Sequence, residues 1–118
     1  MSDAQAAAEG IVARDLTAFQ QNILVILSSE PMYGLAIKRE LEEYYQDEVN
    51  HGRLYPNLDE LVEQGLLSKS ALDKRTNEYA LTEAGEAAIL EHLSWVFEHT
   101  VSSEGRAETV QQLIDEAR

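Results

Sequence analysis

Residues 50–65 read NHGRLYPNLDELVEQG, and their apolar positions predict a helix with one buried face. These positions follow the i, i+4, i+7, i+8 spacing of a single helix face: Leu54, Leu58, Leu61 and Val62. Gly65 is a typical residue just past a helix end. Pro56 lacks a backbone N–H and is tolerated best in a first turn, so the helix is expected to begin near Arg53, or earlier, at Asn50, with a bend.

Two further helices are expected before this one. The first has a broad apolar face made by Leu16, Phe19, Ile23, Ile26 and Leu27, which Leu24 and Val25 widen. Pro31 disfavours helical geometry at Glu30 and should end it. The second helix is short and ends in the polar run 46–48. Its expected apolar positions are Leu35, Leu41 and Tyr45, flanked by Ile37 and Tyr44.

After residue 65 the pattern changes. Segments 66–72 and 77–81 are short, and the polar stretch 73–76 joins them, which predicts a two-stranded hairpin. Thr82 followed by Glu83 is a typical helix start. A long helix and a last helical segment follow, and both carry apolar stripes.

The order of three helices, a hairpin and a long helix is that of a winged helix-turn-helix, in which the third helix enters the DNA major groove and the hairpin lies against the backbone. The expected fold is therefore mainly α with a small β-hairpin, followed by C-terminal dimerisation helices. We expect an N-terminal arm or short helix over residues 1–14, the winged helix-turn-helix over 15–81 and a helical dimerisation region over 82–118.

Composition excludes several classes of protein. The 118 residues suffice for one compact domain, and the absence of cysteine excludes disulfides, thiolate metal sites and thiol catalysis. The longest apolar run, residues 23–27, is far shorter than the ~20 residues of a membrane-spanning helix, and no secretion signal is visible. A cytoplasmic location without a membrane partner is expected.

The net charge of −13 comes from 22 acidic and only 9 basic residues. The 44% hydrophobic content argues against disorder. Instead, the acidity indicates a halophilic protein, because molar salt screens carboxylate repulsion to a Debye length of ~3 Å. Six of the nine basic residues lie between residues 38 and 75 with nine acidic ones, whereas residues 76–118 hold two basic and nine acidic residues.

The motifs GRLYPNL at 52–58, LVEQGLL at 61–67 and YALTEAG at 79–85 resemble those of the PadR-like family of transcriptional regulators. The resemblance covers residues 16–98, including the apolar run at 24–27 and Tyr33-Gly34-Leu35. It implies a homodimer that binds a pseudo-palindromic promoter site, with residues 50–57 reading bases and the hairpin touching phosphates. Together with the acidity, it points to a member from a halophilic archaeon and to a role in the oxidative stress response.

Arg53 and Asn57 share the helix face opposite the leucines and are the candidate base readers. Arginine pairs with guanine, and asparagine with adenine. The alternative for Arg53 is an ion pair with Glu60 or Asp59.

The remaining candidate DNA contacts lie around this helix and along the hairpin. For Asn50, capping the helix and contacting a phosphate are equally favoured. For Tyr55, packing in the core and contacting DNA are equally favoured. Basic side chains complete the set of expected phosphate contacts. The full set is Asn50, His51, Tyr55, Lys69, Lys74, Arg75, Lys38 and Arg39.

The two C-terminal stripes exceed what a three-helix core can cover, so we expect a homodimer interface, the alternative being a tail folded onto the body. The candidate interface residues are Ile89, Leu93, Val96, Phe97, Val101, Val110, Leu113 and Ile114.

No catalytic, cofactor-binding or metal-binding constellation is recognisable, and His92 and His99 are too far apart on one helix to share a metal ion. We therefore expect no enzyme activity, cofactor or metal site. The expected partners are double-stranded DNA, a second copy of the chain and salt cations held between carboxylates and phosphates. Two other functions fit the residues: a winged helix used for protein–protein contact, and a DNA-coating protein without sequence preference.

Overall fold

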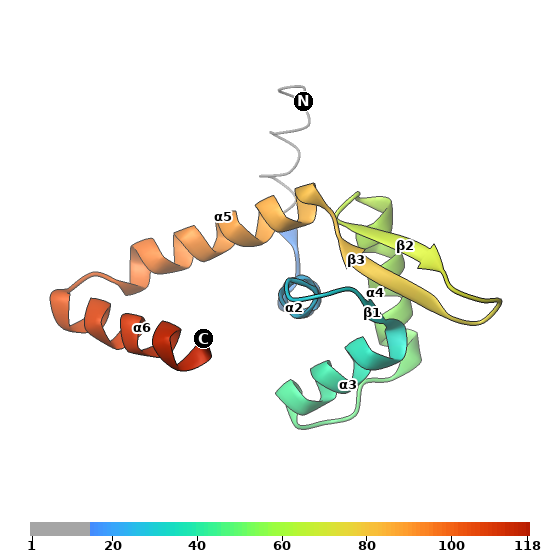
Figure 1. The fold of residues 1–118 in the computed structure, drawn as a ribbon, viewed down its shortest axis with the longest axis horizontal. Helices are drawn as coiled ribbons and strands as arrows, with labels where there is room; N and C mark the ends of the chain where they lie inside the picture. The colour runs from blue at the N-terminus through green and yellow to red at the C-terminus, as the bar shows by residue number, and fades with distance from the viewer. Residues whose placement is uncertain (1–14) are drawn as a thin grey trace, which may run out of the picture.

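The computed structural model describes residues 15–118, so the predicted N-terminal arm at 1–14 lies outside the described residues. The elements, in chain order, are α2 (Ala18–Leu27), β1 (Met32–Tyr33), α3 (Gly34–Tyr45), α4 (His51–Glu63), β2 (Leu67–Ala71), β3 (Asn77–Leu81), α5 (Glu83–Thr100) and α6 (Glu104–Ala117). Helix α2 lies at the centre, α3, α4 and the small sheet lie on one side of it, and α5 and α6 extend away from them (Figure 1). The predicted fold class, a winged helix with additional C-terminal helices, is confirmed.

The sheet has three antiparallel strands in the order β1-β3-β2, not the two that the sequence predicts. The missed strand, β1, has two residues and is therefore too short to show alternation. It pairs Met32 with Tyr79 and Tyr33 with Glu78. The predicted hairpin is present, but its first strand spans Leu67–Ala71 and not 66–72.

Side-chain caps fix where four helices begin. Thr17 and Gln20 form a capping box at the start of α2, and Asn50, Thr82 and Ser103 each accept a hydrogen bond from the backbone of the first turn they precede. Because Asn50 is the cap of α4, Pro56 lies in the second turn. This agrees with the earlier of the two expected starts. The missing N–H of Pro56 leaves the carbonyl of Gly52 without its helical donor at an exposed position.

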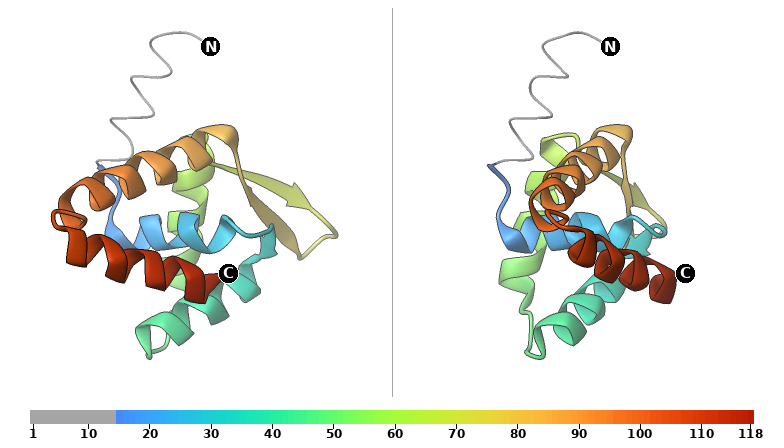
Figure 2. Two further views of the ribbon diagram at one scale, coloured as in Figure 1. Left: turned by 60° about the vertical axis from the view of Figure 1, so that its left-hand side comes forward. Right: turned by 90° about the vertical axis from the view of Figure 1, so that its left-hand side faces the viewer.

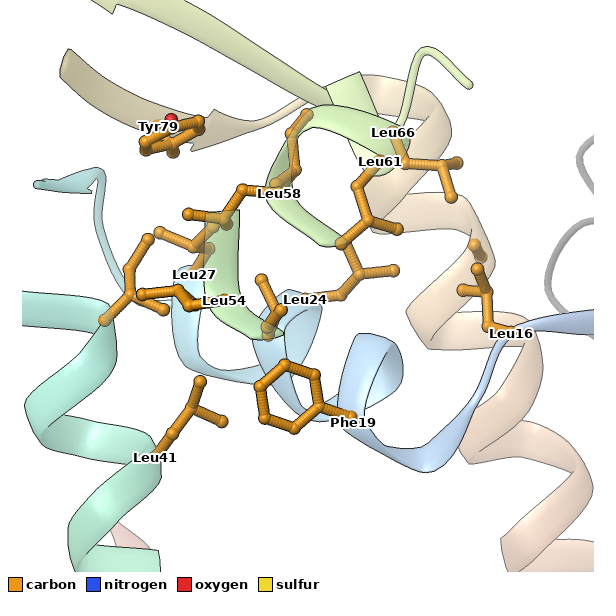
Figure 3. Close-up of a cluster of buried hydrophobic side chains, with 14 of the residues drawn as sticks. Leu16, Phe19, Leu24, Leu27, Leu41, Leu54, Leu58, Leu61, Leu66 and Tyr79 are labelled. Atoms are coloured by element: carbon orange, nitrogen blue, oxygen red, sulfur yellow. The ribbon is translucent and has the colours of Figure 1, made fainter. Parts of the chain in front are cut away.

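The core surrounds α2, and most of its buried leucines come from α2, α3 and α4, with Leu16, Leu66 and Leu67 from the segments beside them (Figure 3). The predicted face of α4 is correct, since Leu54, Leu58 and Leu61 are fully buried.

The predicted face of α3 is correct at Leu41, which is buried, and at Tyr45, which packs against the core, but wrong at Leu35, which is 49% exposed. Of the two predicted flanking residues, Ile37 is buried and Tyr44 is 70% exposed. Leu35, two residues before Ile37, points away from the side that holds Ile37 and Leu41, whereas Tyr44 shares that side but lies in the last turn of the helix.

The last two helices form an arm in which α6 turns back beneath α5 (Figures 1 and 2). Only Gly85 and Ala88, near the start of α5, are buried, and no residue of α6 is. Within residues 15–118, no helix combines the length and apolarity needed to span a membrane.

The start of α5 is fastened to the turn that follows α4. The Thr82 hydroxyl donates to the Gly65 carbonyl at 2.7 Å, and the Thr82 N–H donates to the Leu66 carbonyl at 3.1 Å. A Cβ added at Gly85 would overlap that Leu66 carbonyl oxygen and would lie 2.8 Å from Leu81 Cδ1. Glycine at 85 is thus what allows α5 to approach this closely.

We expect Gly85→Ala to lower the free energy of unfolding by ~1–3 kcal/mol, because a methyl group has no space beside a backbone carbonyl. Chemical denaturation in molar KCl, followed by circular dichroism, measures it. Gly105→Ala is the matched control, because Gly105 is also helical and has no atom within 4 Å of an added Cβ. Equal denaturation midpoints for the two variants would contradict the packing described.

Candidate nucleic-acid interface

The N-terminus of α4 is exposed, and its cap uses Asn50. The Asn50 side chain accepts a hydrogen bond from the Arg53 N–H at 2.8 Å, so it occupies the capping role that the sequence left open. His51 and Gly52 in the first turn are exposed. The His51 ring lies 5.5 Å from the Tyr55 ring. The first turn of α4 therefore presents an imidazole and an uncovered backbone to solvent.

Arg53 is exposed and makes no ion pair with Glu60 or Asp59. Its guanidinium carbon lies 4.0 Å from the centroid of the Phe19 ring on α2 and 5.9 Å from that of Tyr45 on α3. Within residues 15–118, ion pairs join only Lys38 to Glu42 and Lys69 to Asp59. Arg53 thus rests on neutral aromatic rings.

Asn57 is half-buried, and both ends of its amide have partners within the protein. Its Nδ2 donates to the Arg53 carbonyl at 2.7 Å, and its Oδ1 accepts from Gln20 Nε2 at 3.0 Å. One N–H and one lone pair remain for any base or phosphate. A base-reading role for Asn57 stays a prediction.

Tyr55 packs between α3 and the core. It is half-buried against the core cluster, and a Cβ added at Gly34 would lie 2.7 Å from its hydroxyl oxygen. The structure therefore gives this residue the packing role, with its hydroxyl against Gly34 at the start of α3.

We define the wing as β2, β3 and the residues 72–76 between them. The tip of the wing, residues 73–76, is a hydrogen-bonded turn. The Asp73 carboxylate accepts the N–H groups of Arg75 at 2.8 Å and Thr76 at 2.9 Å. The Arg75 N–H is the main cause that lowers the pKa of Asp73 below its usual value. Lys74 and Arg75 are exposed at this tip.

The other basic candidates differ in how far they are neutralised. Lys69 on β2 lies 3.4 Å from Asp59 on α4, and Lys38 lies 2.9 Å from Glu42. Glu42 also accepts the Val49 N–H, and that backbone bond, followed by the Lys38 bond, lowers the pKa of Glu42. Arg39 is exposed.

Two residues that sequence reasoning assigned no role at the interface, Gln20 and Tyr45, lie against the candidate base readers Arg53 and Asn57. Phe19, expected only as a core residue, also lies against Arg53. The one local signal is the Thr17-x-x-Gln20 capping box, which indicates that Gln20 faces the helix start. The contact with α4 is long-range and leaves no sequence signature.

The candidate dimerisation residues occupy the arm formed by α5 and α6. Leu93, Leu113 and Ile114 are 42%, 59% and 38% exposed, and Leu90 and Trp95 beside them are both 55% exposed. The other members are half-buried: Ile89, Val96, Phe97, Val101 and Val110. The arm of a single chain leaves a broad apolar surface uncovered.

His92 and His99 flank Trp95, with ring centroids 6.3 and 4.3 Å from it. In the described part of the chain, no group of three or more histidine or acidic side chains could hold a metal ion.

The model of the transcriptional regulator PadR-like family matches residues 23–91. A structure of RosR from Halobacterium salinarum, grown from NaBr, is 60% identical, the match covers 89% of this chain and 96% of that one, and the TM-score is 0.88. A RosR complex designated RosR-S4 is 58% identical, with 92% of this chain and 95% of that one covered and a TM-score of 0.90. A PadR-like transcription factor from Bacteroides fragilis is 28% identical, with coverages of 80% and 87% and a TM-score of 0.62. No curated protein sequence matches the chain.

Proposed function

The chain belongs to the PadR-like family of transcriptional regulators, and we propose that it acts as a homodimer on a pseudo-palindromic promoter site in a halophilic archaeon. It is a DNA-binding regulator and not an enzyme. One observation carries the finer proposal: Arg53 and the wing-tip Lys74 and Arg75 have no carboxylate partner among residues 15–118, although acidic residues outnumber basic ones 22 to 9.

In the proposed complex the first turns of α4 lie in the major groove. Arg53 donates two hydrogen bonds to guanine, and Asn57 contributes its remaining N–H. Lys74 and Arg75 contact phosphates from the wing, and the weaker phosphate contacts come from Asn50, His51, Tyr55, Lys69, Lys38 and Arg39.

We assign DNA binding to residues 15–81 and dimerisation to residues 82–118. The arm supports this division, because its exposed leucines and Trp95 have no cover within the described chain. Apolar patches of this kind mark interaction sites. Dimers are also typical of PadR-like regulators.

Salt cations complete the proposed interface. Asp59 and Glu63 are exposed on α4, and Lys69 neutralises only the first. Facing DNA, these carboxylates repel phosphates unless cations lie between them. We assign K⁺ or Na⁺ to this position.

The role in the oxidative stress response rests on the sequence resemblance alone. The chain has no cysteine, so a direct thiol switch is excluded.

Selection of a random duplex library in molar KCl tests the regulator. We expect enrichment of an inverted repeat whose half-sites are ~34 Å apart, because one helical turn separates the two reading helices of a dimer. Arg53→Ala should reduce discrimination at one guanine by ~1–3 kcal/mol, and Arg75→Ala should weaken all sequences alike. Gly105→Ala on α6, where an added Cβ has no atom within 4 Å, lies outside these contacts and is the control.

Retention without any enriched sequence would replace the proposal with the DNA-coating function. No retention by a folded dimer would replace it with the protein–protein function.

The affinity for the selected site should stay flat or rise with KCl into the molar range. Ordinary DNA binders instead lose affinity with a log–log slope of about −0.9 per phosphate neutralised. Asp59→Asn combined with Glu63→Gln removes the proposed cation ligands and should restore a falling slope, whereas Glu104→Gln with Asp115→Asn on α6 should not. A steep loss for the folded wild-type protein would exclude bound cations.

Leu93→Glu combined with Leu113→Glu should convert the dimer to a monomer, because both changes bury a charge in the apolar arm. Light scattering coupled to gel filtration gives the mass. Leu35→Glu introduces the same charge at an equally exposed leucine on α3 and should leave the dimer intact. A dimeric double variant would place the interface elsewhere.

A further inference from the structure

A stripe of polar side chains runs along α4 beside its buried leucines, and we define the polar stripe as Arg53, Asn57, Glu60 and Gln64. These residues are spaced i, i+4, i+7 and i+11 and share one helix face. The face lies against the first turn of α2, where Phe19 and Gln20 are 4% and 5% exposed. Phe19 lies beside Leu24 and Leu41 (Figure 3).

Gln20 is the buried polar residue that organises the polar stripe. Its Nε2 donates to Asn57 Oδ1 at 3.0 Å and to Glu60 Oε2 at 3.1 Å, while its Oε1 accepts the Thr17 N–H at 3.1 Å. Gln64 Nε2 donates to the other oxygen of Glu60 at 3.4 Å. The Glu60 carboxylate is therefore held by two neutral amides.

Arg53 occupies the other end of the polar stripe, on a surface we define as the aromatic shelf, Phe19 and Tyr45. The two rings are stacked, with centroids 6.1 Å apart, and Asn22 Nδ2 donates to the Tyr45 hydroxyl at 2.9 Å. A guanidinium over a ring face keeps its N–H donors at the edge of the plane, where they are free for a base.

We propose that Gln20 and Phe19, on α2, are positioning residues for Arg53: Gln20 holds Glu60 away from the arginine, and Phe19 fixes the plane of its guanidinium. This inference rests on the proposed function, in which Arg53 reads guanine. This arrangement keeps the N–H donors of Arg53 available, because an exposed ion pair with Glu60, worth up to ~1 kcal/mol, would have to break before the arginine could bind a base.

Without the Gln20 amide, Glu60 keeps only the longer bond from Gln64, and Asn57 Oδ1 loses its donor. Arg53 and Glu60 share one face of α4 and are seven residues apart, about 10.5 Å along the helix axis. An extended arginine side chain that turns toward the C-terminus of the helix can span this gap.

The test measures discrimination, the ratio of the affinities for the selected site and for the same site with the Arg53 guanine replaced. Phe19→Leu should lower discrimination ~2–5-fold, the equivalent of one cation–π contact at an exposed site. Gln20→Met, which keeps the length but not the donor, should also lower discrimination. Adding Glu60→Gln should restore it, because no carboxylate remains to capture Arg53.

Thr17→Ala is the matched control, since it removes the cap of α2 but neither Gln20 Nε2 nor the aromatic shelf. It should reduce thermal stability and leave discrimination unchanged. In an Arg53→Ala background, Phe19→Leu and Gln20→Met should have no further effect on discrimination. A purely structural role would give equal losses with and without Arg53.

The inference is overturned if the wild type discriminates and Phe19→Leu does so equally well, or if Glu60→Gln fails to rescue folded Gln20→Met. If Gln20→Met does not fold, the test rests on Phe19→Leu, whose effect on discrimination is compared in the wild-type and Arg53→Ala backgrounds. A wild-type protein that does not discriminate refutes the proposed function instead, so the two failures are distinguishable.

Discussion

The packing of α4 against α2 sets the direction of the α4 side chains in the candidate interface. Leu54, Leu58 and Leu61 are fully buried in one cluster with Ile23 and Leu24. Rotating α4 would expose these leucines, at ~1.5–3 kcal/mol for each. Because the apolar face is fixed, the other faces are fixed as well: the polar stripe meets the first turn of α2, and Asp59 meets Lys69 on the wing. The direction of Arg53 is thus a consequence of leucine packing.

The parts of this arrangement that the sequence predicts are the local ones. Leucine spacing gives the buried face of α4, Asn50 gives its start, and Gly65, with a φ of 81°, gives its end. Strand β1 was missed because two residues carry no periodicity and their partners on β3 are distant in sequence. The setting of Arg53 was missed for the same reason, since the Gln20–Asn57 bond joins residues 37 positions apart. The alternative that the sequence leaves open for Arg53, an ion pair with Glu60 or Asp59, does not form: Arg53 lies over Phe19, and Glu60 is bound by Gln20.

Whether a basic side chain of this acidic protein is free to bind DNA depends on whether the nearby carboxylates accept hydrogen bonds from it or from neutral N–H groups. Two of its lysines are paired with carboxylates, Lys38 with Glu42 and Lys69 with Asp59. On α4, which carries Arg53, and at the wing tip, which carries Arg75, neutral N–H groups hold a carboxylate instead. Asp73 accepts two backbone N–H groups of the wing tip, and Glu60 accepts two glutamine amides. The same device thus operates at both proposed contact points with DNA. Because the pKa of Asp73 is lowered, its carboxylate stays charged, and keeps accepting these two N–H groups as an anion, until the pH falls through that lowered value.

Helix α2 also links the interface to the arm. It packs against α3, α4, α5 and β3, while Val25 on its outer side is 54% exposed. The residues that hold Arg53 and the contacts with α5 belong to this one helix of ten residues. Helix α2 is therefore the element that fixes where the proposed base reader lies relative to the arm, and in the proposed dimer it sets the separation of the two reading helices.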